Sequence, residues 1–373
     1  GLDIVETLVS NDPSNIPARR KFAIFHQKLG DTYVRQGNLT KALEVFSLSL
    51  NILEKISEDD SANASAKLKL DLATSFSRVG DTLADQGHLD KAQESFQLSF
   101  EIIKELADND PSDTSTQRYL YVSYEKLGEI LAKQGNVNDA LEFFQLSLDI
   151  AEKLADNAPL NAAAQRDLYA IFIKFGDIFT SQKKHVEASK FFQSSLGIAE
   201  KLADRDPENI PAQQDLALSY EKLGDTLIFQ KKLTEALGFF QKSLKIRKII
   251  ADQDLSDASA QRDLAVSFNK VGDTLKAQGN LDEALDFFRQ DLAISEKLAA
   301  DDPSSATAQT DLVISLGRLG SSLAGRPATA AQGRDYLERG LKHLRELRDE
   351  NRLNSQQIEW IVWFKKQIEE SAR

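Results

Sequence analysis

The 373-residue chain contains no cysteine and no methionine, and only four histidines. Without cysteine it can form neither disulfides nor thiolate metal sites, and it has no cysteine nucleophile. The histidines are widely separated in the sequence, and no HExxH motif or phosphate-binding loop is present. We therefore expect a non-catalytic protein that needs no cofactor and no metal.

Two further features are missing. No stretch is long and apolar enough to cross a bilayer, and no signal peptide opens the chain. Basic residues are also in deficit, because the net charge is −12. An acidic surface repels the phosphates of nucleic acids. We expect a cytoplasmic protein that binds neither a membrane nor, directly, a nucleic acid.

What the chain does contain is a glycine that recurs seven times. The first two copies are 50 residues apart, and each later copy follows after 48 residues. A fixed period of this size indicates one supersecondary unit stacked on itself. We call these positions the reference glycines and name each repeat after its own: Gly30, Gly80, Gly128, Gly176, Gly224, Gly272 and Gly320.

The Gly128 repeat shows what one unit contains. Apolar residues spaced three or four apart predict an amphipathic helix over 115–134, which Gly135 ends in the left-handed conformation. Asn138 is the predicted cap of a second helix, whose apolar stripe runs from Ala140 to Leu154. Each repeat is therefore predicted to be a hairpin of two helices.

Several sequence columns recur in step with the reference glycine. An aromatic or another large residue stands four positions before it in most repeats, and Leu, Val or Phe stands immediately before it. Alanine follows twelve positions later, and an aromatic ring sixteen positions later. Small residues allow paired helices to approach closely, and the rings fill the remaining space. Because the rings recur in every copy, they indicate a core and not a ligand cage.

These columns resemble the tetratricopeptide repeat, in which an aromatic residue and Leu-Gly on the first helix are followed by Ala-x-x-x-Phe on the second. The units here exceed the usual length of about 34 residues, so both helices should be longer. The resemblance implies an all-α, right-handed superhelical solenoid of antiparallel helical hairpins. It also implies a concave face lined by first helices that binds a partner protein or peptide.

We expect a single solenoid over residues 1–373. Residues 1–12 read as the remnant of a preceding repeat helix, 13–302 as six full repeats, 303–350 as a partial seventh repeat and 354–373 as a C-terminal capping helix. The opening residues resemble the middle of a second helix, so we expect a piece cut from a larger protein. An alternative function is therefore a sensor or regulatory arm of a bacterial signalling or defence protein, attached to a caspase-like protease or a nucleotide-switch ATPase.

Charged columns flank the predicted groove. An acid follows six reference glycines, a base stands two positions before all seven, and arginine stands ten positions before four of them. In one interpretation, acid and base pair locally three residues apart on the same helix. In the other, they face the groove and steer a mixed-charge partner in a salt-dependent way. The candidate partner-binding residues in these columns are Asp177, Asp225, Arg118 and Arg166.

Apolar residues at positions that are variable between repeats suggest an exposed binding patch. They are Tyr121, Tyr169, Ile173, Ile228 and Phe229. Packing around a local irregularity is the alternative explanation. The C-terminal helix is apolar on more than one side, which indicates either a deeply packed lid or a dock for a further domain or a second subunit.

Overall fold

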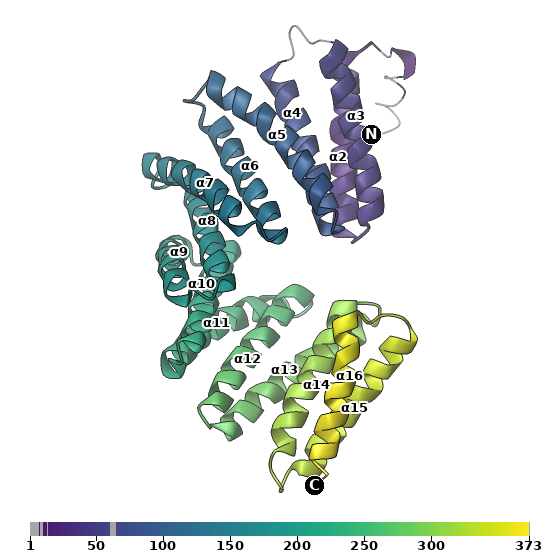
Figure 1. Cartoon of the computed structure of the whole chain (residues 1–373), viewed down its shortest axis with the longest axis vertical. Helices are drawn as coiled ribbons and strands as arrows, with labels where there is room; N and C mark the ends of the chain where they lie inside the picture. Colours follow the sequence, from purple (N-terminus) through teal and green to yellow (C-terminus); the bar gives the residue numbers. More distant parts are fainter. Residues whose placement is uncertain (1–6, 8–9, 13, 60–64, 373) are drawn as a thin grey trace. The chain divides into compact units, whose positions relative to one another are not determined.

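The computed structural model describes residues 7, 10–12, 14–59 and 65–372 (Figure 1). Most of the predicted remnant at 1–12 lies outside the described residues. From residue 14 onward, the described residues form fifteen α-helices, α2 to α16, and no strand. The predicted all-α architecture of antiparallel helical hairpins is confirmed.

The chain divides into two compact units, Gly1–Gln182 and Lys183–Arg373. Unit 1 contains α2 (Ile16–Arg35), α3 (Leu39–Asp59), α4 (Ala66–Asp85), α5 (Leu89–Asn109), α6 (Thr114–Lys133), α7 (Val137–Asn157) and α8 (Ala162–Ser181). Unit 2 contains α9 (His185–Arg205), α10 (Ile210–Phe229), α11 (Leu233–Gln253), α12 (Ala258–Ala277), α13 (Leu281–Asp301), α14 (Ala306–Ala324), α15 (Ala330–Asp349) and α16 (Ser355–Glu370).

Within each unit, the hairpins are held together by a close approach at the reference glycine. A Cβ atom added to Gly128 on α6 would lie 2.6 Å from Cε1 of Phe144 on α7. The Phe144 ring is buried and occupies the space that a side chain at residue 128 would need. The same contact recurs between glycine and phenylalanine at 30 and 46, 80 and 96, 224 and 240, and 272 and 288. The recurring ring is therefore core, as predicted.

Side chains and turns fix where the helices begin and end. The carboxylate of Asp113 accepts hydrogen bonds from the backbone N–H groups of Ser115 and Thr116 and so caps α6. Gly135, with a φ of +86°, makes the tight turn into α7 as predicted. The predicted cap Asn138 is wrong: α7 already begins at Val137, and Asn136 at the N-cap makes no side-chain cap bond. The turn is so short that the second helix starts before residue 138.

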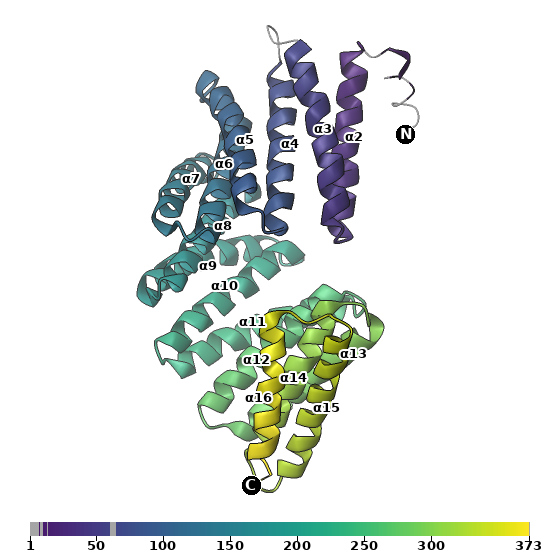
Figure 2. The same ribbon diagram turned by 45° about the vertical axis from the view of Figure 1, so that its right-hand side comes forward.

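The C-terminal helix occupies the place of a first helix in a further repeat. Figures 1 and 2 show α16 beside α14 and α15, and Ile361 and Phe364 join the cluster formed by those two helices. The predicted start is confirmed, because Asn354 and Gln357 form a reciprocal capping box.

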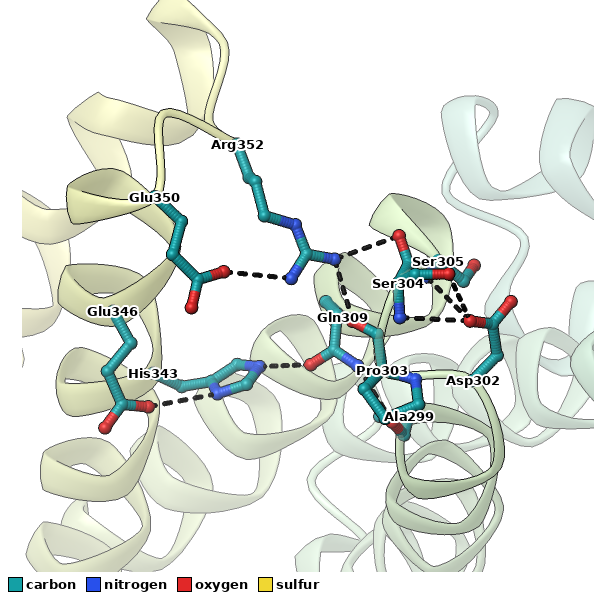
Figure 3. A network of polar contacts seen from close by, with 10 residues as sticks. All are labelled: Ala299, Asp302, Pro303, Ser304, Ser305, Gln309, His343, Glu346, Glu350 and Arg352. Atoms are coloured by element: carbon teal, nitrogen blue, oxygen red, sulfur yellow. Dashed lines mark hydrogen bonds and ion pairs between the residues drawn. The ribbon is translucent and has the colours of Figure 1, made fainter. Parts of the chain in front are cut away.

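Polar contacts tie the linker before α16 to the junction between α13 and α14 (Figure 3). Nη2 of Arg352 donates to the carbonyl oxygens of Pro303 at 2.9 Å and Ser304 at 3.0 Å. Nearby, the Gln309 amide donates to the Ala299 carbonyl at 2.8 Å, and its oxygen lies 2.7 Å from Nε2 of His343. These contacts fix the seventh hairpin and the capping helix against the preceding repeat.

The glycine contact predicts a paired result. Gly128→Ala should destabilise the protein by about 1–3 kcal/mol, because the added methyl group overlaps Phe144. Gly238→Ala should instead stabilise it by about 0.5–1 kcal/mol, because residue 238 is an exposed helical glycine with open space around it. Urea unfolding of both variants measures the difference, and equal effects would contradict the packing role of Gly128.

Candidate partner-binding surface

The first helix of each hairpin presents one face that carries the charged columns. Positions ten, six and two residues before the reference glycine, and one after it, are spaced three or four apart and therefore share a helix face. We call this the first-helix face.

One row of ion pairs crosses this face between neighbouring repeats. The base two positions before a reference glycine pairs with the acid one position after the preceding reference glycine. In unit 1, Lys126 Nζ lies 2.7 Å from Asp81 Oδ1, and in unit 2, Lys270 Nζ lies 2.5 Å from Asp225 Oδ1. The other pairs of this row are Arg78 with Asp31, Lys174 with Glu129, and Arg318 with Asp273.

A second row of ion pairs lies about two helical turns closer to the N-termini of the first helices. Arg118 binds both carboxylate oxygens of Asp167, at 2.6 and 3.0 Å, and Arg262 lies 2.5 Å from Asp311. Arg20 pairs with Asp71 in the same way. The acid is always supplied by the next repeat, nine positions before its reference glycine. Sequence analysis overlooked this acidic column.

Both charged rows are thus compensated between repeats. The prediction of local pairs within one helix is wrong, because the long side chains bridge to the neighbouring first helix. The alternative prediction, that unpaired charges face a groove, is also wrong for Arg118 and Asp225, because both residues form ion pairs. Arg166 and Asp177 on α8 also have interaction partners. Partly exposed pairs of this kind contribute at most about 1 kcal/mol each, so their main effect is to fix the register of adjacent repeats.

Between the two rows runs a stripe of apolar residues that sequence analysis missed. Each member stands six positions before its reference glycine and is only partly buried or exposed. The first-helix stripe consists of Ile24, Val122 and Ala170 in unit 1, interrupted by Thr74, and of Leu218, Val266 and Ile314 in unit 2. Beside Val122, Tyr119 is 42% exposed and replaces the aspartate found at its column in most repeats. The sequence does contain a signal for this stripe, because its members all stand at the same position, six residues before the reference glycine.

The predicted exposed apolar patch is wrong at three of its five residues. Tyr121, Tyr169 and Ile173 are buried, and the Tyr121 hydroxyl donates to the Asp167 carbonyl at 3.0 Å. These larger side chains fill the core where other repeats carry smaller or polar ones. The alternative of local repacking accounts for them.

The other two residues of the predicted patch behave differently. Ile228 is partly buried against the core cluster of unit 2. Phe229 is 59% exposed and stacks on the ring of His185, with centroids 4.2 Å apart. Phe229 is therefore the one member of the patch whose ring is mainly open to solvent.

The apolar C-terminal helix is only half covered. Ile361 and Phe364 are buried, whereas Ile358, Trp363 and especially Val362 are exposed. The helix is thus packed as a lid on one side. Docking of a further domain or subunit on its other side stays a prediction.

A buried carboxyl group lies below the first-helix face in the Gly272 repeat. Asp291 on α13 is 1% exposed and stands where five other repeats carry serine. Burial raises the pKa of Asp291 from its ordinary value of 3.8 to about 7. The hydroxyl of Ser315, the guanidinium of Arg318 and the amide of Asn269 counteract this rise in pKa, and the charge of Asp311 adds to it.

Among residues 14–59 and 65–372, no group of three His, Asp or Glu side chains could hold a metal ion. A helix with the length and apolarity needed to span a membrane is likewise absent from the part of the chain that the structure describes.

Comparisons with known proteins agree with the fold. Two tetratricopeptide-repeat family models match, one over residues 118–201 and the other over 216–254 and 264–304. No curated protein is significantly similar in sequence. The matched segments, which together make up less than half of the chain, are tetratricopeptide repeats, and the repeat period here is lengthened to 48 residues.

Solved structures of repeat proteins are similar to the chain. BtubC (BKLC) from P. vanneervenii aligns with a TM-score of 0.56 and 19% identity over 72% of this chain and 94% of its own. A signal transduction ATPase with numerous domains, a protein from Pyrococcus horikoshii with a tetratricopeptide repeat sensor, aligns with a TM-score of 0.57 and 14% identity. That match covers 92% of this chain and 46% of the ATPase. At these identities the similarity concerns the fold alone.

Two substitutions test the corrected patch. Ile173→Asp should destabilise the protein by about 3 kcal/mol or more, because it buries an unpaired carboxylate. Phe229→Asp should change stability by less than about 1 kcal/mol, because the ring is mainly exposed. Thermal and urea unfolding compare the two, and a small effect of Ile173→Asp would contradict its burial.

Asp291 predicts a pH dependence of stability. Since its folded-state pKa is raised, the folded protein keeps the proton while the unfolded chain releases it between about pH 4 and 7. Stability should therefore fall over that range by up to about 4 kcal/mol and then level off. Asp291→Ser should remove this component, so its gain over the natural chain should be larger at pH 8 than at pH 4.5 in urea titrations. A gain independent of pH would refute the raised pKa.

Proposed function

We propose that the chain is a non-catalytic scaffold that binds a partner protein or peptide along its first-helix faces. The observation that carries the proposal is the first-helix stripe, a line of partly exposed apolar residues bordered by compensated charges. Tetratricopeptide repeats generally mediate protein–protein interaction, and an apolar stripe with a polar border is typical of a recognition surface.

The border explains how selectivity could arise without free charge. Each ion pair leaves carboxylate or guanidinium groups partly exposed; the Arg118 side chain, for example, is 52% exposed although Arg118 is bonded to Asp167. Such groups can hydrogen-bond to the backbone of an extended segment, while its apolar side chains cover the stripe. Affinity should then depend less on salt than for a surface of unpaired charges.

Site-specific photo-crosslinking tests this surface. A photoreactive phenylalanine analogue placed at Tyr119 or Val266 on the first-helix face should capture a partner polypeptide in the source cells. The matched controls are Leu98 and Leu146, which are exposed to a similar degree on second helices. Leu218→Glu and Ile314→Glu, which flank Val266 on the stripe of unit 2, together should reduce the capture at Val266 at least tenfold. Equal capture from first and second helices would overturn the proposal.

A second proposal is that the chain acts as the sensor or regulatory arm of a larger bacterial signalling or defence protein, attached to a nucleotide-switch ATPase or a caspase-like protease. Its support is the similarity to the ATPase with a tetratricopeptide repeat sensor, of which this chain spans less than half. The exposed residues Ile358, Val362 and Trp363 of α16 would then contact the attached domain. The reading frame that encodes the chain decides this: an adjoining ATPase or protease domain supports the arm, and none would refute it.

A further inference from the structure

An internal arginine in the Gly224 repeat provides a template for a binding site in the next repeat. Arg247 on α11 is 8% exposed and reaches between two first helices. Its Nε lies 3.3 Å from the Glu221 carboxylate on α10, and its Nη1 lies 2.7 Å from Asp263 on α12. Ser243 also donates to Glu221, at 2.6 Å. The partly buried Glu221 carboxylate therefore has a guanidinium partner within the chain.

The Gly272 repeat has the same positions but lacks the cation. The residue that corresponds to Arg247 is Ser295, and the one that corresponds to Ser243 is Asp291. The counterpart of Glu221 is Asn269, whereas the aspartate of the following repeat is kept, as Asp311. The Gly224 repeat therefore carries its carboxylate on the first helix, whereas the Gly272 repeat carries it on the second. The short side chain of Ser295 takes the position of the arginine.

A cavity of about 310 Å³ opens at this point. Its walls are the first helices α12 and α14, with Val266 and Ile314 of the first-helix stripe at its sides. Asp291 and Ser295 of α13 form its floor. The volume is close to the lower limit of about 300 Å³ for ligand pockets. It occupies the space that corresponds to the Arg247 side chain.

Two buried oxygen atoms in this cavity lack a hydrogen-bond partner. They are Oδ2 of Asp291 and Oδ1 of Asn269. The Ser315 hydroxyl and the Asn269 amide approach the Asp291 carboxyl group and counteract the rise in its pKa, but Oδ2 of Asp291 still lacks a hydrogen-bond partner. The Ser315 hydroxyl is also shared with Ser295, whose hydroxyl oxygen lies 3.0 Å away, and with the Asp311 carbonyl. A buried acceptor without a hydrogen-bond partner destabilises the folded state, and a charged one does so more strongly.

The cations that line the cavity are already paired with other acids. Arg262 bonds Asp311, Lys270 bonds Asp225 and Arg318 bonds Asp273. Each of these side chains lies at the outer border, where it is about 36% exposed or more. Asp291 at the floor has no ion-pair partner among the described residues at salt-bridge distance.

We propose that this cavity binds the guanidinium group of an arginine side chain of the partner polypeptide, held by Asp291 and Asn269 in the manner of Arg247 in the preceding repeat. The inference rests on the proposed function, since the arginine belongs to a segment lying on the first-helix stripe. A guanidinium fits better than an ammonium, because its planar fork donates to several acceptors at once. Asp291, Asn269 and the free lone pairs of Asp311 surround the cavity on three helices.

The test uses two peptides that differ only in charge. Acetyl-Gly-Arg-Gly-amide and its citrulline counterpart have nearly the same shape, but citrulline is neutral. They are titrated at pH 8 into the isotopically labelled full chain, and backbone NMR signals of Asn269, Ser295 and Ser315 are followed. The arginine peptide should bind at least tenfold more tightly than the citrulline peptide, and Asp291→Ser should abolish this preference.

A second variant fills the cavity from within. Ser295→Arg restores the arginine of the preceding repeat, so it should abolish binding of the arginine peptide and raise the melting temperature. Ser194→Arg adds the same charge at an exposed position on a second helix of the same unit, and it should leave the peptide affinity unchanged.

The outcomes separate this inference from the proposed function. Equal affinity for the two peptides, or binding retained in both Asp291→Ser and Ser295→Arg, would overturn the arginine site. Crosslinking at Tyr119 and Val266 would still stand in that case, because it does not require an arginine. If crosslinking fails while the arginine preference is observed, the partner surface is wrong and the cavity is a site for free guanidinium compounds.

Discussion

The structure depends on the close approach of two helices at the reference glycines. At five of them a ring from the second helix lies where a Cβ atom of the first helix would otherwise be, as Phe144 does against Gly128, and at Gly320 the Leu337 side chain takes this place. This contact sets the distance between paired helices, and its recurrence gives these repeats the same hairpin. Residues on the first-helix face are not needed for that contact. They are consequently where repeats can differ without loss of the fold.

Residues of the first-helix face that are not needed for the hairpin fall into two groups. Some form ion pairs between repeats, and others are left to contact a partner in the proposed function. The charged side chains of this face form ion pairs between neighbouring repeats, because each base bonds an acid on the next or the previous first helix. What remains for a partner is the apolar stripe between the rows and the cavity beside Asp291. The adjacent Arg247 network shows that the scaffold can hold a guanidinium at this depth, provided that carboxylates from two helices surround it.

The sequence was sufficient for the hairpins, the turns and the recurring rings, since each of these leaves a column at a fixed distance from Gly128 and its equivalents. It was insufficient for contacts between repeats. The pairing of Arg118 with Asp167 depends on which first helices are neighbours and on their stagger. Burial of Tyr121 and Ile173 was also hidden, because an apolar residue at a variable position looks the same whether it fills a gap or faces water.

In the proposed function, the first helices, and not the second, form the partner surface. Amide hydrogen exchange of the complex recovered with its native partner distinguishes the two sets of helices. Exchange should slow along α6, α10, α12 and α14, at the turns of helix that carry the stripe, and remain unchanged along α5, α7 and α11. Protection confined to the second helices would contradict the account.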